Sequence, residues 1–413
     1  MPTPRTSTPS RPLRATDAAA ALGTETAFAA AAAARRLERE GRDVVHLEIG
    51  EPGIPTPPHI VEAGERALRD GHTHYVSPAG IPELRDAIAG SLVERGVHTT
   101  AEHVIVTSGG KPGILYAALA LIRPGDEVLI PDPGFPIYPS VVRLAGGTPV
   151  SYPVDLEASA GIDPAAIAER ITPRTRVLVL NEPNNPTGGT ASSATLDAIA
   201  ELVRAHDLAV ISDEVYGRLR FTGRPESIAA RDGLLARTVL VDNFSKTYAM
   251  TGWRLGWVVV PTPLREAMER LVINSTSCTA PFVQLAGVAA LTGPQQVVDD
   301  LVARLRRTRD ALVAGLRTID GITCPTPAGA FYAFPDIRAL AGRAGLDDVG
   351  LATFLLERHG VATLGGSGFG PRGAGHLRLS YAAPPEVIAE AVTRLAAAAR
   401  ELAALPVRQE KVS

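Results

Sequence analysis

The stretch VLVLNEPNNPTGGTASSATLDAIAELVRAHDLAVISD (177–213) indicates the fold of this chain. Two short apolar runs, residues 177–181 and 208–212, lie on either side of an amphipathic segment from Ser192 to His206. Strands that are apolar on both faces and separated by helices are typical of a parallel sheet buried between helices. Similar apolar runs occur at 103–107, 127–131 and 238–242. The sequence therefore predicts an α/β fold with a mostly parallel sheet.

The chain is long enough for more than one core, since its 413 residues exceed the roughly 100–200 of a typical domain. After about residue 262 the pattern becomes mostly helical, and the last hundred residues mix short strands with helices, which indicates a separate α+β lobe. We expect four parts: a disordered tail (1–17), an N-terminal segment packing with the small domain (18–60), a large domain (61–295) and a small C-terminal domain (296–413).

The composition excludes several classes of protein. Lys+Arg 41 against Asp+Glu 44 gives a net charge of −3, which argues against a nucleic-acid binder. No apolar run reaches the roughly 20 residues that span a bilayer, so no membrane partner is expected. Cys278 and Cys324 are too few for a disulfide framework, and no Cys/His cluster has the spacing of a metal site. A reducing, cytoplasmic compartment is expected.

Polar sequences follow four of the expected strands. Ligands of open parallel sheets bind beyond the carboxyl ends of the strands. The glycine-rich turn at 108–111 leads into a helix and suits a phosphate, although Pro112 excludes a P-loop. Each sequence alone is compatible with an ordinary turn, a helix cap or a solvated lysine. The four are Ser108-Gly109-Gly110-Lys111, Asn181-Glu182-Pro183-Asn184-Asn185-Pro186-Thr187-Gly188, Asp213-Glu214-Val215-Tyr216, and Asn243-Phe244-Ser245-Lys246 with Thr251-Gly252-Trp253-Arg254.

Taken together and in this order, these sequences resemble the class I/II aminotransferases of the fold-type I pyridoxal-phosphate enzymes. The resemblance extends from about Leu47 to the C-terminal helix, and its most specific piece is SKTYAMTGWRLG (245–256). It is closest to the subgroup of prokaryotic aspartate aminotransferases. The resemblance implies pyridoxal 5′-phosphate as cofactor and a large domain with a sheet of about seven strands, beside a smaller α+β domain.

The resemblance also implies roles for residues around the cofactor. Lys246 is expected to form the Schiff base and to move the Cα proton. Asp213 is expected to face the pyridine nitrogen, while Tyr216 and Asn185 hydrogen-bond the ring oxygen. Phe135, in DPGFPIYP (132–139), matches the aromatic residue that stacks on the ring.

A phosphate dianion needs several donors, and the resemblance assigns them along the chain. It assigns backbone N–H groups to Gly109, Gly110 and Lys111, a hydroxyl to Ser245 and a guanidinium to Arg254. Tyr75, in HYVSPAGIPELR (74–85), matches the tyrosine that reaches the phosphate of a neighbouring subunit. A homodimer is therefore expected.

For the substrate, the resemblance assigns the α-carboxylate to Arg378, whose planar fork suits a carboxylate better than lysine does. The backbone of Gly50 and the side chain of Asn185 would also contact the substrate. Lys111 matches a lysine that pairs with the distal carboxylate of acidic substrates. Phe28 and the segment 22–26 are expected to form a lid.

The resemblance implies a ping-pong transfer of an amino group from an L-amino acid, with aspartate favoured, to a 2-oxo acid such as 2-oxoglutarate. Three departures from the family pattern, at Asn243, Glu182 and Gly365, leave room for another outcome. The alternative is an enzyme of the same fold repurposed as an oxidase, for elimination or replacement, or for carbon–carbon bond formation.

Overall fold

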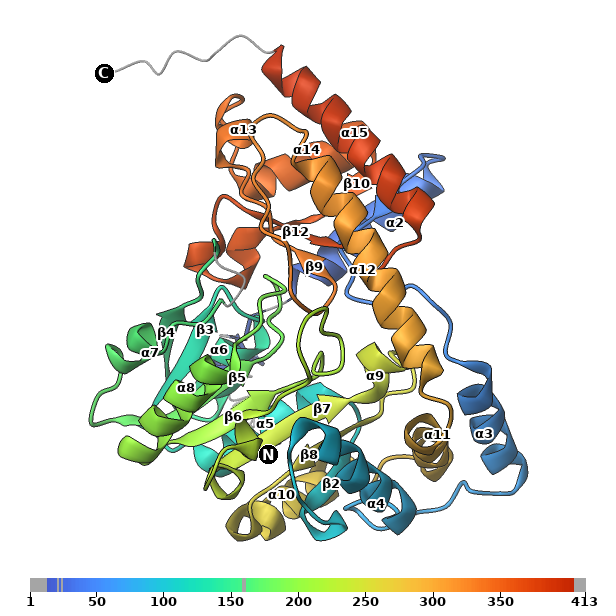
Figure 1. Cartoon of the computed structure of the whole chain (residues 1–413), viewed down its shortest axis with the longest axis vertical. Coiled ribbons are helices and arrows are strands. Elements are labelled where there is room, and N and C mark those ends of the chain that lie inside the picture. The colour runs from blue at the N-terminus through green and yellow to red at the C-terminus, as the bar shows by residue number, and fades with distance from the viewer. Residues whose placement is uncertain (1–12, 21, 24, 158–160, 405–413) are drawn as a thin grey trace, which may run out of the picture.

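The computed structural model describes residues 13–20, 22–23, 25–157 and 161–404 (Figure 1). Its centre is a seven-stranded sheet of order β2-β8-β7-β6-β5-β3-β4. The strand β8 runs antiparallel to both neighbours, and the other six strands share one direction. This confirms the predicted α/β class. The strands are β2 (Val104–Thr107), β3 (Glu127–Asp132), β4 (Thr148–Pro153), β5 (Thr175–Asn181), β6 (Ala209–Asp213), β7 (Thr238–Asn243) and β8 (Gly256–Val259).

Helices bury both faces of this sheet, because side chains of a strand alternate between its faces. On β5, Val177 and Val179 pack into a core with α5, α6 and α10, whereas Leu178 and Leu180 pack into a core with α8. This double burial explains why the strands are apolar runs without alternation. The helices of this lobe are α3 (Pro58–Arg69), α4 (Pro82–Ser91), α5 (Gly110–Leu121), α6 (Ile137–Leu144), α7 (Pro164–Ala168), α8 (Ser193–Ala205), α9 (Phe244–Thr247), α10 (Thr262–Ser275) and α11 (Pro281–Thr292).

A smaller lobe lies above the sheet in Figure 1 and is joined to it by the long helix α12 (Gln296–Leu316). Its antiparallel sheet has the order β11-β12-β9. The N-terminal strand β1 (Val45–His46) pairs with β10, and α2 (Thr26–Arg39) packs Ala34 and Leu37 against this lobe. The remaining elements are α1 (Asp17–Ala20), β9 (Tyr332–Ala333), α13 (Arg338–Gly342), α14 (Asp348–His359), β10 (Val361–Ala362), β11 (Leu364–Gly365), β12 (Leu377–Ser380) and α15 (Pro385–Ala403).

Two strands of the central sheet were not predicted. β4 lies at the edge and contains two prolines, so it lacks a continuous apolar run. β8 is four residues long and follows the motif 245–256 directly. The domain boundaries stay predictions, and residues 1–12 of the expected tail lie outside the described residues. Among the described helices, none is both long and apolar enough to cross a membrane.

Candidate active site

A cavity of about 440 Å³ lies where the carboxyl ends of β5, β6 and β7 face the small lobe. Its volume is typical of a small-molecule site. A larger hollow of about 990 Å³ lies elsewhere, around Arg317, Cys324 and His376, and contains none of the predicted site residues. The smaller cavity is lined by most of them, namely Gly50, Gly110, Lys111, Phe135, Asn185, Asp213, Tyr216, Ser245, Lys246, Arg254 and Arg378.

Lys246 lies on the short helix α9, immediately after β7. The side chain of Asn243 caps this helix by accepting a hydrogen bond of 2.8 Å from the backbone N–H of Ser245. The Lys246 ammonium donates to the backbone oxygen of Gly50 at 2.6 Å. Burial, assisted by the positive charge of Arg378, lowers the pKa of Lys246 to about 8. A neutral, nucleophilic amine is therefore accessible near neutral pH.

Asp213 is the last residue of β6 and is almost fully buried. Its Oδ2 accepts a hydrogen bond of 2.7 Å from Tyr138 Oη. This bond lowers the pKa of Asp213, but burial has the larger effect and raises that pKa to about 7. No basic side chain in the described part of the chain forms an ion pair with this carboxyl group. A buried carboxylate without a cation is costly, so the site suits a cationic ring nitrogen of a ligand.

Tyr138 was missed by the sequence reasoning. It lies in the first turn of α6, three residues after Phe135, which precedes this helix. The two rings are in edge contact, with centroids 5.9 Å apart. The spacing of the two aromatic residues in DPGFPIYP was the signal that could have identified it.

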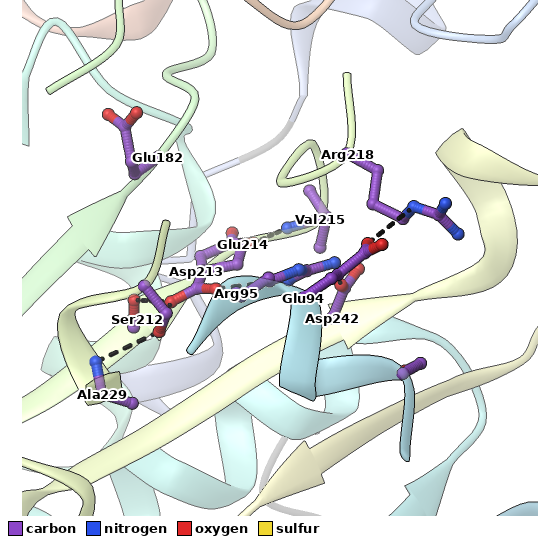
Figure 2. A network of polar contacts seen from close by, with 12 residues as sticks. Glu94, Arg95, Glu182, Ser212, Asp213, Glu214, Val215, Arg218, Ala229 and Asp242 are labelled. Carbon is purple, nitrogen blue, oxygen red and sulfur yellow. Dashed lines mark hydrogen bonds and ion pairs between the residues drawn. The ribbon is translucent and has the colours of Figure 1, made fainter. Parts of the chain in front are cut away.

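A buried ionic network lies beside Asp213 (Figure 2). Arg95 donates to Glu214 Oε2 at 3.2 Å and to Asp242 Oδ2 at 2.6 Å. The other oxygen of Glu214 accepts from Ser212 Oγ at 2.9 Å and from Ser227 Oγ at 2.6 Å. One guanidinium thus forms ion pairs with two buried carboxylates at the ends of β6 and β7. No sequence signal pointed to Arg95.

Arg378 lies on β12 and reaches the cavity from the small lobe. It donates to Asn185 Oδ1 at 3.2 Å and to the backbone oxygen of Glu48 at 2.5 Å. Its guanidinium carbon lies 4.4 Å from the centre of the Tyr332 ring. No carboxylate of the described residues pairs with Arg378, and its buried Nε has no partner. The arrangement therefore suits the carboxylate of a ligand.

Two glycines permit close approach in this site. Gly109 has φ +97°, and a Cβ at this position would lie 2.4 Å from Arg254 Nη2. The turn and the guanidinium of Arg254 are therefore in close contact, although Gly109 itself does not line the cavity. A Cβ on Gly50 would lie 2.1 Å from Tyr332 Oη. This hydroxyl, which was also missed from sequence, hydrogen-bonds Tyr216 Oη at 2.9 Å. The N–H of Gly109 donates to the backbone oxygen of Thr107 at 2.8 Å, whereas Gly110 and Lys111 lie in the first turn of α5. The N–H groups of that turn and the guanidinium of Arg254 fit a phosphate.

The residues expected to form a lid line the cavity, whereas the tyrosine expected to contact a second subunit lies on the surface. Glu25 and Phe28 line the cavity, and the carboxylate of Glu25 forms an ion pair with Lys111. Tyr75 is 87% exposed and does not line the cavity of its own chain.

Comparison with known proteins matches residues 42–395 to the family model "Aminotransferase class I and II". The chain is 39% identical to the aspartate/prephenate aminotransferase of Cereibacter sphaeroides, over 88% of this chain and 93% of that protein. It is 38% identical to an arginine–pyruvate transaminase of Pseudomonas aeruginosa, over 88% and 93%. The solved aspartate aminotransferase of Thermus thermophilus with maleate superimposes with a TM-score of 0.88 at 38% identity, over 94% of this chain and all of that one. These relatives favour transamination over the alternative chemistries.

Proposed function

We propose a substrate and residue roles for this chain, which belongs to the class I and II aminotransferases. It is a pyridoxal 5′-phosphate-dependent aminotransferase, and this confirms the resemblance inferred from its sequence. When bound, the cofactor supplies the electron sink for the reaction. The observation that carries the residue assignment is that one cavity holds the amine of Lys246, the buried carboxyl of Asp213 and the guanidinium of Arg378.

The chain's own groups would hold each part of the cofactor. Lys246 would bind its aldehyde carbon covalently, and Asp213 would pair with its ring nitrogen, with Tyr138 orienting the carboxylate. Tyr216 and Asn185 would hydrogen-bond the ring oxygen. Phe135 would stack on the ring. The phosphate would accept hydrogen bonds from the backbone N–H groups of Gly110 and Lys111, the hydroxyl of Ser245 and the guanidinium of Arg254. Gly109, whose N–H donates to Thr107, would allow Arg254 to approach the turn closely.

For the substrate, Arg378 would bind the α-carboxylate, and the stacked Tyr332 ring would fix the plane of the fork. Asn185 already accepts from Arg378 and would hold that fork from the large lobe. The backbone of Gly50, which also lines the cavity, would contact the substrate as well. The Lys246 amine, with its pKa of about 8, would take the proton from the substrate Cα and pass it to the C4′ carbon of the cofactor in the same half-reaction. In the second half-reaction it would carry a proton in the reverse direction, from C4′ to the Cα of the 2-oxo acid.

The donor that we propose is L-aspartate, with 2-oxoglutarate as acceptor. Lys111 supports an acidic substrate, because its ammonium projects into the cavity that Arg378 enters from the small lobe. Two charged groups at separate positions suit a dicarboxylic acid, whose two carboxylates are also separated. The names of the relatives from Cereibacter sphaeroides and Thermus thermophilus support the same choice.

A panel of donors tests this proposal. With 2-oxoglutarate as acceptor, kcat/KM for L-aspartate should exceed that for L-alanine at least about tenfold, because only aspartate gains the contact with Lys111. L-Arginine serves as the contrasting donor, since one relative is an arginine–pyruvate transaminase. The production of glutamate from each donor is the measurement. A preference for arginine or alanine would overturn the substrate and leave the enzyme class intact.

We also propose that the enzyme is a homodimer in which Tyr75 completes the site of the partner. The support is its position, since Tyr75 is 87% exposed and lies outside the cavity of its own chain, which leaves its hydroxyl free to contact a neighbouring subunit. Sedimentation should give twice the mass of the chain, and Tyr75→Phe should weaken cofactor binding. A monomer of full activity would contradict this assignment.

A cytoplasmic location is proposed from the cysteines. Both Cys278 and Cys324 are free thiols, and burial raises the pKa of Cys324 to about 12, so this thiol is unreactive. Free thiols are usual in reducing compartments.

A further inference from the structure

The printed sequence contains three lysines, Lys111, Lys246 and Lys411, and two of them line the same cavity. Lys111 lies in the first turn of α5, and its side chain is 43% exposed. Its ammonium forms an ion pair with the carboxylate of Glu25, whose side chain is 24% exposed. The ammonium proposed to bind the substrate's distal carboxylate is therefore paired with a carboxylate of the chain itself.

We propose that Glu25 is a specificity-determining residue, which competes with the distal carboxylate of an acidic substrate for Lys111. This inference rests on the proposed function. A second carboxylate that approaches an intact ion pair meets a net charge of zero and gains little. It gains the full attraction of Lys111 only when Glu25 leaves. A substrate with an uncharged side chain does not have to separate this pair.

Glu25 lines the cavity and lies close in sequence to a backbone group that is bound to the large lobe. The backbone N–H of Gly23, two residues earlier, donates to Ser140 Oγ on α6 at 3.1 Å. Glu25 directly precedes Thr26, the first residue of α2. The competing carboxylate belongs to the same chain as Lys111 and forms an ion pair with it, so its local concentration at the ammonium is high.

A released Glu25 carboxylate also has a favourable place to go. Glu25 is the N-cap residue of α2, and its side chain makes no capping hydrogen bond while it is paired with Lys111. The amino end of a helix carries free N–H groups and a positive partial charge, which stabilise a carboxylate. When a substrate displaces Glu25 from Lys111, the ion pair is lost, but the Glu25 carboxylate is not left buried without a partner.

The surroundings of Lys111 also suit an uncharged side chain when Glu25 stays in place. The ammonium lies 5.7 Å from the ring centre of Phe28 and 5.5 Å from that of Phe135. Two aromatic rings thus adjoin a neutralised ion pair. The proposal is therefore that Glu25 sets how strongly this pocket prefers acidic to uncharged substrates.

The variants Glu25→Gln and Glu25→Ala test this proposal in the cofactor-loaded enzyme. The ratio of kcat/KM for L-aspartate to that for L-alanine should rise about fivefold in both, the upper end for a partly exposed ion pair. Binding gives a readout independent of turnover: the Kd for succinate, an unreactive dicarboxylate, should fall by a similar factor by calorimetry. Both effects should shrink in high salt, because salt screens exposed charges.

Lys111→Gln separates this proposal from the proposed function. If Lys111→Gln weakens aspartate and succinate but both Glu25 variants leave the ratio and the Kd unchanged, competition by Glu25 is wrong and Lys111 keeps its role. A lower ratio in the Glu25 variants would also overturn the inference, since Glu25 would then assist acidic substrates. If Lys111→Gln affects neither ligand, the acidic-substrate assignment itself fails.

Discussion

We expect Lys246→Ala to abolish transamination and the covalent attachment of the cofactor. A borohydride-reducible bond to the cofactor's aldehyde requires a primary amine, and the partly buried Lys246, with its pKa of about 8, has an accessible neutral form. The same amine is the proposed proton carrier at the substrate Cα, so two functions are lost together. The expected loss in kcat is several orders of magnitude.

Reduction with borohydride followed by peptide mass spectrometry measures the attachment directly. The wild-type protein should carry the reduced cofactor on the peptide that contains Lys246, and Lys246→Ala should carry none. Lys111→Ala is the matched control, because it removes the other lysine of the cavity. This control should keep its covalent cofactor. Attachment at Lys111, or full activity of Lys246→Ala, would refute the assignment of Lys246.

Much of the site could be predicted because its residues directly follow strands. The apolar runs located β5, β6 and β7, and parallel strands place their carboxyl ends on one edge, so Asn185, Asp213 and Lys246 meet there. In the large lobe, the position of a residue just after an apolar run was therefore enough to place it in the active site.

Other contacts could not be predicted because they join segments far apart in the chain. Tyr332 belongs to a strand of two residues, and its hydroxyl meets Tyr216 only because the small lobe folds onto the large one. Arg95 precedes a glycine at the end of a short 3-10 helix, Leu92–Arg95, where an arginine is usually solvated. Its partners Glu214 and Asp242 lie more than a hundred residues later. Nothing in the local sequence distinguishes such an arginine from a surface one.

Arg95 is the partner of two buried carboxylates, so its loss should strongly destabilise the fold. Arg95→Met should destabilise the holoenzyme by about 3–5 kcal/mol at pH 8, because it leaves two buried carboxylates without a cation. Burial already raises the pKa of Glu214 and of Asp242, and Arg95 is the main group that opposes this rise. Without Arg95 both folded-state pKa values should move further above those of the unfolded chain.

The sign of the pH dependence follows from these pKa changes. A carboxyl group whose pKa is raised by folding binds more protons in the folded state, so stability falls as the pH rises through that range. The deficit of Arg95→Met relative to wild type should therefore be smaller at pH 5.5 than at pH 8, as measured by urea unfolding. Arg36→Met is the control, because the Arg36–Glu40 pair is about half exposed, and it should cost less than about 0.5 kcal/mol. A deficit for Arg95→Met that is equally small, or that does not change with pH, would mean that Glu214 and Asp242 do not depend on Arg95 for their charge. In that case Ser212 and Ser227, which already donate to Glu214, would be the groups that stabilise this strand end.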